Sequence, residues 1–262
     1  MLKYRVIPTL LWKNVGLVKG IGFDSWRRVG PVLPAIKVYN LRQVDEIILV
    51  DITATLENRE PDYESVAEFT AECFVPMTVG GGIRSIDHIT KLLRAGADKV
   101  AINSGAFEDP ALVREAAGRF GSQCIVASID ARKQPGCTWE CYKNSGTEPT
   151  GKDVIAWAKE MEANGAGEIL LTSIERDGTM TGYDLDLIRK VSAAVTIPVI
   201  ASGGCGNYHH MYEAISTGGA SAVAAASIFH FTEKTPIEAK KYLAGCKIPV
   251  RLINTILHES ER

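Results

Sequence analysis

Short apolar runs rich in β-branched residues alternate with amphipathic stretches along the whole of this chain of 262 residues. The apolar runs are almost uninterrupted, which is typical of strands covered by helices on both faces, as in a parallel sheet. They predict strands at YRVIPTLL (4–11), DEIILVDI (45–52), VPMTVG (75–80), ADKVAIN (97–103), QCIVASID (123–130), GEILLTSI (167–174), IPVIASG (197–203) and ASAVAAAS (220–227).

Amphipathic stretches between these runs often begin at Asp, Ser or Pro and end at Gly, which are common start and stop signals of helices. The clearest helices are predicted over residues 62–74, 85–96, 110–121, 153–165 and 184–194. Repeated strand-then-helix units in a chain of this length predict one α/β domain over residues 1–262, a (β/α)8 barrel. An open, doubly wound sheet is the alternative, but no GxGxxG motif follows the first predicted strand.

The two halves of the sequence resemble each other. PMTVGGGI (76–83) aligns with PVIASGGC (198–205), and DEIILVD (45–51) aligns with GEILLTS (167–173) at the same offset of 122 residues. A duplicated half-barrel explains this repeat, with halves at about 1–120 and 121–252. It also predicts two equivalent binding sites related by a pseudo-twofold axis.

Composition excludes several classes of protein. The formal net charge of −2 gives no reason to expect a nucleic acid or an anionic membrane as partner. The sequence has no apolar run of the roughly 18 residues that a membrane span needs, and its N-terminus lacks the features of a signal peptide. We therefore expect a cytoplasmic protein.

The six cysteines do not predict a metal site. Cys137 and Cys141 are four residues apart, but no second pair of cysteines or histidines at a suitable spacing accompanies them. We expect reduced thiols, no bound metal and no cofactor.

Glycine-rich segments follow several predicted strands, at the end of a barrel where binding sites form. These segments are GGGI (80–83), NSGA (103–106), RDGT (176–179), SGGCG (202–206) and AAS (225–227). Glycine lets backbone N–H groups approach an anion closely, and a following helix N-terminus adds a partial positive charge. The glycines could instead serve only tight turns, but their occurrence in both halves favours two phosphate sites. A ligand with a phosphate at each end would fill both.

Four blocks of sequence resemble a known family. VGGGIRS, GADKVAIN, EILLTSIERDGTMTGYD and IPVIASGG are similar to the HisF-type cyclase subunit of imidazole glycerol phosphate synthase, and the similarity runs from about Met1 to Leu252. In that family the barrel receives ammonia from a glutaminase (HisH-like) partner and closes an imidazole ring. The resemblance implies phosphate binding by Gly82, Asn103 and Ser104 at one site and by Asp177, Gly178, Gly204, Ala226 and Ser227 at the other.

The resemblance also implies two proton-transfer aspartates, at the ends of the first and fifth strands. Asp130 ends the fifth strand, but the first strand reads IPTLLW where the family reads IPCLDV, so Leu11 replaces the aspartate and Thr9 the cysteine. The internal repeat likewise places Leu11 opposite Asp130. A leucine side chain cannot exchange a proton, and losing one partner of an acid–base pair typically lowers the rate by about 10²- to 10⁴-fold.

Other residues near the family's reaction site are retained, namely Lys19, Asp51 and Thr172. The resemblance therefore makes Asp130, Lys19 and Asp51 the catalytic candidates. One alternative is that a residue such as Asp51 supplies the missing base. The related isomerase branch also depends on an aspartate that ends the first strand, so Leu11 argues against that activity too.

The resemblance implies that a ring of charges at the opposite end of the barrel gates ammonia. Its counterparts here are Arg5, Glu46, Lys99 and Glu168, and Asp98 corresponds to a residue that touches the glutaminase. The ring could instead only cap the barrel core with paired charges, because buried charges need partners in any case.

A retained gate beside a missing aspartate resembles a divergent branch that accompanies acetamidino-sugar formation in bacterial surface polysaccharides. The resemblance implies amidotransfer to a nucleotide sugar, with a glutaminase-like subunit and an ATP-dependent N-acetyl-sugar amidotransferase as partners. Two alternatives remain: a cyclase subunit with relocated acid–base chemistry, and a non-catalytic sensor of a phosphorylated small molecule. Residues 134–152 are long enough to form a lid or a docking hairpin.

Overall fold

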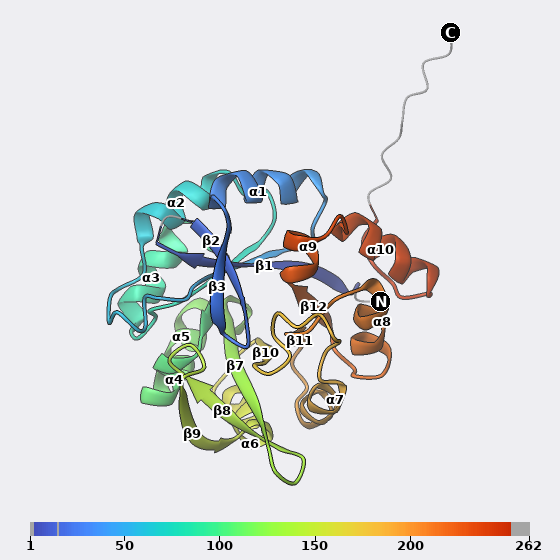
Figure 1. Ribbon diagram of the computed structural model, residues 1–262. Coiled ribbons are helices and arrows are strands. Elements are labelled where there is room, and N and C mark those ends of the chain that lie inside the picture. The colour runs from blue at the N-terminus through green and yellow to red at the C-terminus, as the bar shows by residue number, and fades with distance from the viewer. Residues whose placement is uncertain (1–2, 15, 253–262) are drawn as a thin grey trace.

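The computed structural model describes residues 3–14 and 16–252, and these form a closed barrel of parallel strands with helices outside it (Figure 1). The pairing of β7 with β10 closes the ring, which excludes the open-sheet alternative and confirms the predicted (β/α)8 fold. The barrel strands are β1 (Arg5–Lys13), β4 (Ile47–Asp51), β5 (Met77–Gly80), β6 (Lys99–Ile102), β7 (Ile125–Gln134), β10 (Glu168–Ser173), β11 (Val199–Ser202) and β12 (Ala222–Ala225).

Helices follow the barrel strands and end where the sequence signals predict. For example, the Ser85 side chain accepts a hydrogen bond from the backbone N–H of His88 at the start of α3, and Gly96 follows the helix with φ of +99°. The helices are α1 (Val32–Leu41), α2 (Tyr63–Ala71), α3 (Ile86–Arg94), α4 (Ser104–Glu108), α5 (Ala111–Phe120), α6 (Val154–Ala163), α7 (Leu185–Ala194), α8 (Tyr208–Ser216), α9 (Ser227–Phe231) and α10 (Pro236–Gly245), with a 3-10 turn at Ser122–Cys124.

The strands are buried on both faces, as their continuous apolar character predicts. Alternate side chains such as Ile7, Ile48 and Ile200 fill the inside of the barrel. The intervening side chains, such as Val6 and Leu49, pack against the helices in a larger outer core. The middle of the barrel is therefore a packed core.

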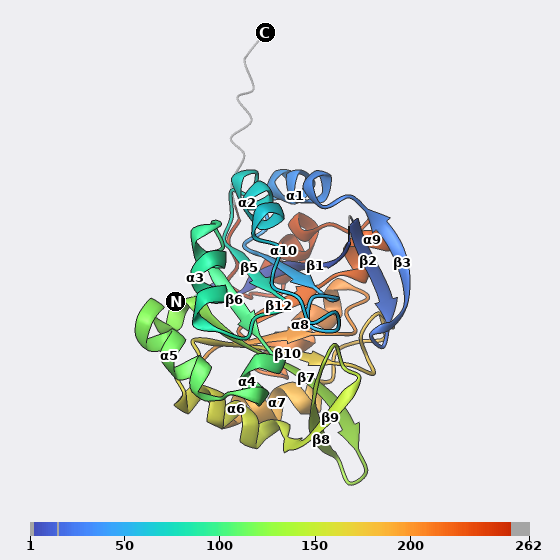
Figure 2. The same ribbon diagram turned by 90° about the vertical axis from the view of Figure 1, so that its left-hand side faces the viewer.

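Two β-hairpins stand at the same end of the barrel (Figure 2). The first is formed by β2 (Gly16–Ile21) and β3 (Asp24–Gly30), and the second by β8 (Thr138–Lys143) and β9 (Glu148–Asp153). Sequence analysis did not predict the first hairpin, whereas it gave residues 134–152 as a lid or a docking hairpin, and β8 and β9 form a hairpin there. In β3 and β9 most residues are polar or exposed, so no apolar pattern marks these two strands.

Residues 253–262 of the predicted single domain lie outside the described residues. Within residues 3–14 and 16–252, no helix is long and apolar enough to cross a membrane.

Candidate functional site

A cavity lies at the carboxyl ends of the barrel strands, at the end that carries both hairpins. It is lined by every residue that the sequence assigned to catalysis or to phosphate binding. These are Lys19, Asp51, Gly82, Asn103, Ser104, Asp130, Asp177, Gly178, Gly204, Ala226 and Ser227.

Strand register shows which residue of the second half is equivalent to Leu11. Leu11 pairs with Val50 of β4, and Asp130 pairs with Thr172 of β10. Val50 and Thr172 are themselves 122 residues apart and therefore equivalent in the repeat. Leu11 and Asp130 consequently occupy equivalent places, and both line the cavity.

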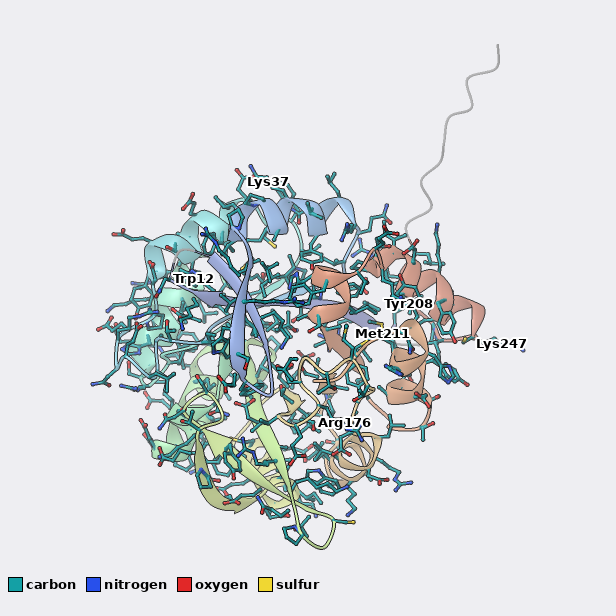
Figure 3. The ribbon with its side chains drawn as sticks, viewed as in Figure 1. Trp12, Lys37, Arg176, Tyr208, Met211 and Lys247 are labelled. Carbon is teal, nitrogen blue, oxygen red and sulfur yellow. The ribbon has the colours of Figure 1, made fainter. Side chains whose placement is uncertain are left out.

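The next residue of β1 points to the other side of the sheet. Trp12 is buried, and its ring meets that of Phe69 in α2 edge-on, with 5.3 Å between ring centroids. Figure 3 shows Trp12 on the side of the barrel that α2 covers. The apolar end of β1 thus serves two layers: Leu11 faces the cavity and Trp12 the outer core.

Asp130 lies deep in the cavity beside Asn103, whose Nδ2 donates to its Oδ2 over 3.3 Å. Burial raises the pKa of Asp130 to about 7, and the nearby charge of Asp177 acts in the same direction. Near neutral pH this carboxyl group can therefore exist in both protonation states, as a general acid or base requires.

Lys19 and Asp177 form a buried ion pair that joins the first hairpin to the loop after β10. Lys19 is 2% exposed and Asp177 8%. The backbone N–H of Gly22 also donates to the carbonyl oxygen of Asp177 over 2.9 Å, and a side chain at Gly178 would meet the Gly20 carbonyl oxygen at 2.1 Å. The first hairpin is therefore held closely against this loop.

Both polar groups through which Asp177 could contact a phosphate already have partners among the described residues. Its backbone N–H donates to the carbonyl oxygen of Ser173 over 3.0 Å, and its side chain is paired with Lys19. Burial raises the pKa of Asp177, although Lys19 acts in the opposite direction. This geometry favours a role other than the phosphate binding that the resemblance implies.

Asp51 accepts hydrogen bonds through both carboxylate oxygens. Oδ1 accepts from the backbone N–H and hydroxyl of Thr53 and from the N–H of Ala54, all within 3.1 Å. Oδ2 accepts from Arg59 over 2.6 Å. These bonds fix the loop after β4 and leave Asp51 poorly placed to act as the missing base.

The glycine turns of the two halves have matching backbone geometry. Gly81 and Gly203 have φ of +107° and +87°, and an added side chain would meet the carbonyl oxygen of the last residue of the preceding barrel strand in each case, at 2.2 Å and 2.6 Å. Gly82 and Gly204 also have positive φ. Close backbone packing therefore requires glycine at these turns whether or not a phosphate binds there.

The second hairpin closes the Asn103 side of the cavity. The backbone N–H of Asn144 donates to the hydroxyl of Ser104 over 3.0 Å, and the Ser145 hydroxyl donates to the carbonyl oxygen of Ile52 over 2.9 Å. The two hairpins also meet, because the Phe23 ring lies against Gly146. Sequence analysis did not identify Phe23 or Ser145 as cavity residues, since no motif or period marks either one.

The four predicted gate residues form a ring at the other end of the barrel. Arg5 contacts Glu46 at 2.7 Å and Glu168 at 2.6 Å, and Lys99 contacts the same two carboxylates at 3.0 Å and 2.8 Å. Burial disfavours the charge on Glu168, but Arg5 and Lys99 outweigh it and lower the pKa of that carboxyl group. The ring alternates in charge and is fully paired.

Asp98, the predicted partner contact, is exposed at the same end. One of its carboxylate oxygens accepts a hydrogen bond from the N–H of Met77 over 2.8 Å. Asp98 therefore also stabilises the start of β5 within its own chain.

The cysteines are all free thiols. Within the described part of the chain, no group of three or more His, Cys, Asp or Glu side chains is arranged to hold a metal ion.

Comparison with known proteins agrees with this architecture. Residues 5–235 match the family model described as "Histidine biosynthesis protein". The chain is also 47% identical over 257 residues to the imidazole glycerol phosphate synthase subunit HisF of Trichormus variabilis, a match that covers 96% of this chain and 99% of that protein. The chain therefore belongs to the histidine biosynthesis protein family and is of the HisF type.

Proposed function

We propose that this barrel is the synthase subunit of an imidazole glycerol phosphate synthase, which takes ammonia from a glutaminase partner and transfers it to a ligand with two phosphates. The observation that carries this proposal is that the barrel has two equivalent loop sets at its mouth and a charged ring at its opposite end. The similarity to a named synthase subunit supports it.

The mouth is suited to a ligand with an anion at each end. One loop set contains Gly82, Asn103 and Ser104, and the other contains Gly204 and Ser227. Both sets present glycine or backbone at the cavity wall, so phosphate oxygens can approach main-chain N–H groups closely. Asp130 lies near both loop sets, since Asn103 donates to it and the charge of Asp177 acts on it, so it would contact the middle of the ligand.

A buried hydroxyl group on the cavity wall suits a small neutral guest such as ammonia. The hydroxyl of Thr9 is buried on the cavity wall, and among residues 3–14 and 16–252 it has no hydrogen-bond partner. A buried polar group of this kind calls for a small polar molecule, and ammonia can fill that role. Asp98 and the ring would face the glutaminase.

Turnover with ammonium salts tests this proposal without the partner. The purified barrel should convert the two-phosphate precursor of the synthase to the imidazole product, and the gene should restore growth to a histidine auxotroph that lacks its cyclase. Absence of both activities from a folded protein would contradict the proposal.

A second candidate is favoured by Leu11, which removes one of the two aspartates on which the family relies. In this candidate the barrel passes ammonia to an ATP-dependent amidotransferase that forms an acetamidino group on a nucleotide sugar. The Leu11→Asp variant separates the candidates. If the variant gains cyclase turnover that the unaltered chain lacks, the scaffold is competent but Leu11 excludes the first candidate; cyclase turnover by the unaltered chain would exclude the second.

A further inference from the structure

We infer that His88 is a positioning residue of the first loop set, which contains Gly82, and that protonation of its ring strengthens anion binding there. The equivalent His210 has no such effect on the second loop set, which contains Gly204. The inference rests on the proposed function for its two anion sites. It goes beyond that function because it makes two equivalent sites respond differently to pH.

The two histidines lie behind the glycine turns of the two loop sets. His88 in α3 and His210 in α8 are 122 residues apart, which is the offset of the internal repeat. Figure 1 shows the two helices on opposite sides of the barrel. Each ring accepts a hydrogen bond through Nδ1 from the backbone N–H four residues earlier, at Arg84 over 3.3 Å and at Gly206 over 3.1 Å. Each histidine therefore holds the backbone next to a glycine turn.

The surroundings of His88 are compatible with a protonated ring. Its Nδ1 also lies 3.1 Å from the carbonyl oxygen of Gly82, and its Nε2 lies 3.9 Å from Oε1 of Glu60. A protonated ring can thus donate to a carbonyl oxygen on one side and face a carboxylate on the other. The neutral ring can instead accept from Arg84 through Nδ1. Protonation therefore exchanges one backbone partner of Nδ1 for another.

Other ionisable groups around His88 leave its two nitrogens to these partners. The titratable and charged side chains that surround it are Glu60, Tyr63, Arg84, Asp87 and Lys91. Asp87 and Lys91 pair with each other at 2.7 Å. The Arg84 guanidinium group reaches the loop after β4, where it donates to the carbonyl oxygen of Thr55 over 3.0 Å. Among the described residues, Glu60 is the only carboxylate within 4.0 Å of a ring nitrogen of His88.

Both ring nitrogens of His210 face hydrogen-bond donors. Nδ1 meets the N–H of Gly206, and Nε2 lies 3.0 Å from Nδ2 of Asn207. The Asn207 amide is oriented by its Oδ1, which accepts from the backbone N–H of His210 over 2.9 Å, so its Nδ2 faces the ring as a donor. A protonated ring would therefore point an N–H group at a donor on each side.

The neighbours of His210 do not compensate for this geometry. Burial lowers the pKa of His210, with Glu213 acting in the opposite direction and His209 in the same direction. In the loop after β10, a side chain at Gly182 would meet the His210 ring at 3.7 Å, and this residue carries no charge. We therefore expect protonation to reach His88 and not His210 where histidines ordinarily titrate, near about pH 6.5.

Protonation of His88 has two consequences for an anion at the first loop set. It places a positive charge behind Gly82, and it releases the N–H of Arg84, because a protonated Nδ1 can no longer accept. Arg84 and Gly82 both line the cavity. A backbone N–H that has lost its acceptor can bind an anion, so both consequences strengthen binding.

The test measures sulfate binding to the full chain between about pH 5.5 and 8 by NMR of backbone amides. Sulfate is the probe because its charge stays constant over this range, whereas phosphate groups titrate near about pH 6. The Gly82 amide reports the first loop set and the Gly204 amide the second. Lowering the pH should strengthen sulfate binding about three- to tenfold more at Gly82 than at Gly204.

The informative variant is His88→Asn, because an amide can accept from Arg84 but cannot become charged. It should remove the extra pH dependence at Gly82 and bind sulfate as the unaltered protein does at about pH 8. Asp130 has a pKa of about 7 and titrates in the same range, but it does so in both proteins, so their difference isolates His88. The matched control His210→Asn should leave the pH dependence at Gly82 unchanged.

Nitrogen chemical shifts of the His88 ring give a second reading that needs no ligand. The neutral ring should carry its hydrogen on Nε2, and the Arg84 amide should shift as the ring is protonated. A neutral ring with its hydrogen on Nδ1 would overturn the inference. So would the same pH dependence at Gly82 in His88→Asn as in the unaltered protein, or no sulfate binding at Gly82 at any pH.

The outcomes for the inference and for the proposed function are separate. Turnover with ammonium salts together with any of these contrary results would leave the proposed function intact. The expected pH response without turnover would contradict the proposed function and leave the assignment of His88 in place.

Discussion

The two halves of this barrel share a backbone plan but differ in the side chains that can do chemistry. Their glycine turns, capped helices and strand registers correspond at offsets of 119 to 123 residues. Against that common plan, the first half has Leu11 where the second has Asp130. The comparison teaches that the repeat maintains the shape of the mouth, while the reactive groups are set independently in each half.

The largest expected effect is a difference in turnover between variants at two equivalent positions, Asp130 and Leu11. Asp130→Asn should lower ammonia-dependent turnover by about 10²- to 10⁴-fold, because the amide cannot accept a proton from the reacting nitrogen. The matched variant Leu11→Asn should change turnover by less than about tenfold. Steady-state kinetics with saturating ammonium salts would measure both. Equal losses would show that the two halves contribute equally after all.

The next effect concerns a histidine found in only one half. His230 in α9 corresponds to Phe107 in α4, which stacks on Trp157 with 4.4 Å between ring centroids. Burial lowers the pKa of His230 to about 4, with the positive charge of Lys19 acting in the same direction, and Tyr39 lies 3.5 Å from its Nδ1.

Because the folded protein disfavours protonated His230, its contribution to stability is complete above the unfolded pKa of about 6.5. It should be lost as the pH falls from about 6.5 toward 4, by at most about 3 kcal/mol. His230→Phe, which copies the first half, should remove this part of the acid sensitivity. Urea unfolding of both proteins at pH 7 and pH 4 measures it, and parallel losses would refute the assignment.

A smaller difference, in unfolding free energy, is expected between two equivalent residues of the charged ring. Glu46 and Glu168 are 122 residues apart, but Glu46 is 2% exposed and also accepts from the hydroxyl of Thr78. Glu46→Gln should cost about 2 kcal/mol of unfolding free energy and Glu168→Gln about 1 kcal/mol, since the more buried position leaves its partners less accessible to water. Chemical denaturation at neutral pH checks the order, and a larger loss at Glu168 would reverse this reading of the ring.

The smallest effect is expected to be the same in both halves. Ser85 and Asn207 cap α3 and α8, and each accepts a hydrogen bond from the backbone N–H of the histidine three residues later. Ser85→Ala and Asn207→Ala should each cost about 1 kcal/mol. Thermal unfolding of the two variants should give similar shifts, and a difference of several-fold would show that the repeat is not maintained in the helix caps.

Much of the fold could be predicted because the strands are buried on both faces and their apolar runs stand out. The place of Asp130 at the mouth also follows from its position at the end of a strand. The first hairpin could not be predicted in this way, and residues 134–152 could be given only as a lid or a docking hairpin, since residues such as Arg27 and Glu148 give no periodic apolar pattern. The pairing of Lys19 with Asp177 joins residues 158 positions apart and depends on a hairpin that the sequence did not indicate.

The two halves contribute unequal charges to the ring, and this should affect how separated halves associate. Both cations, Arg5 and Lys99, come from the first half, whereas each half supplies one carboxylate. If the chain were cut near residue 120, two first halves would bring a net charge of about +2 to the ring and two second halves about −2. Only the mixed pair would be neutral, so the separated fragments should select each other over copies of themselves.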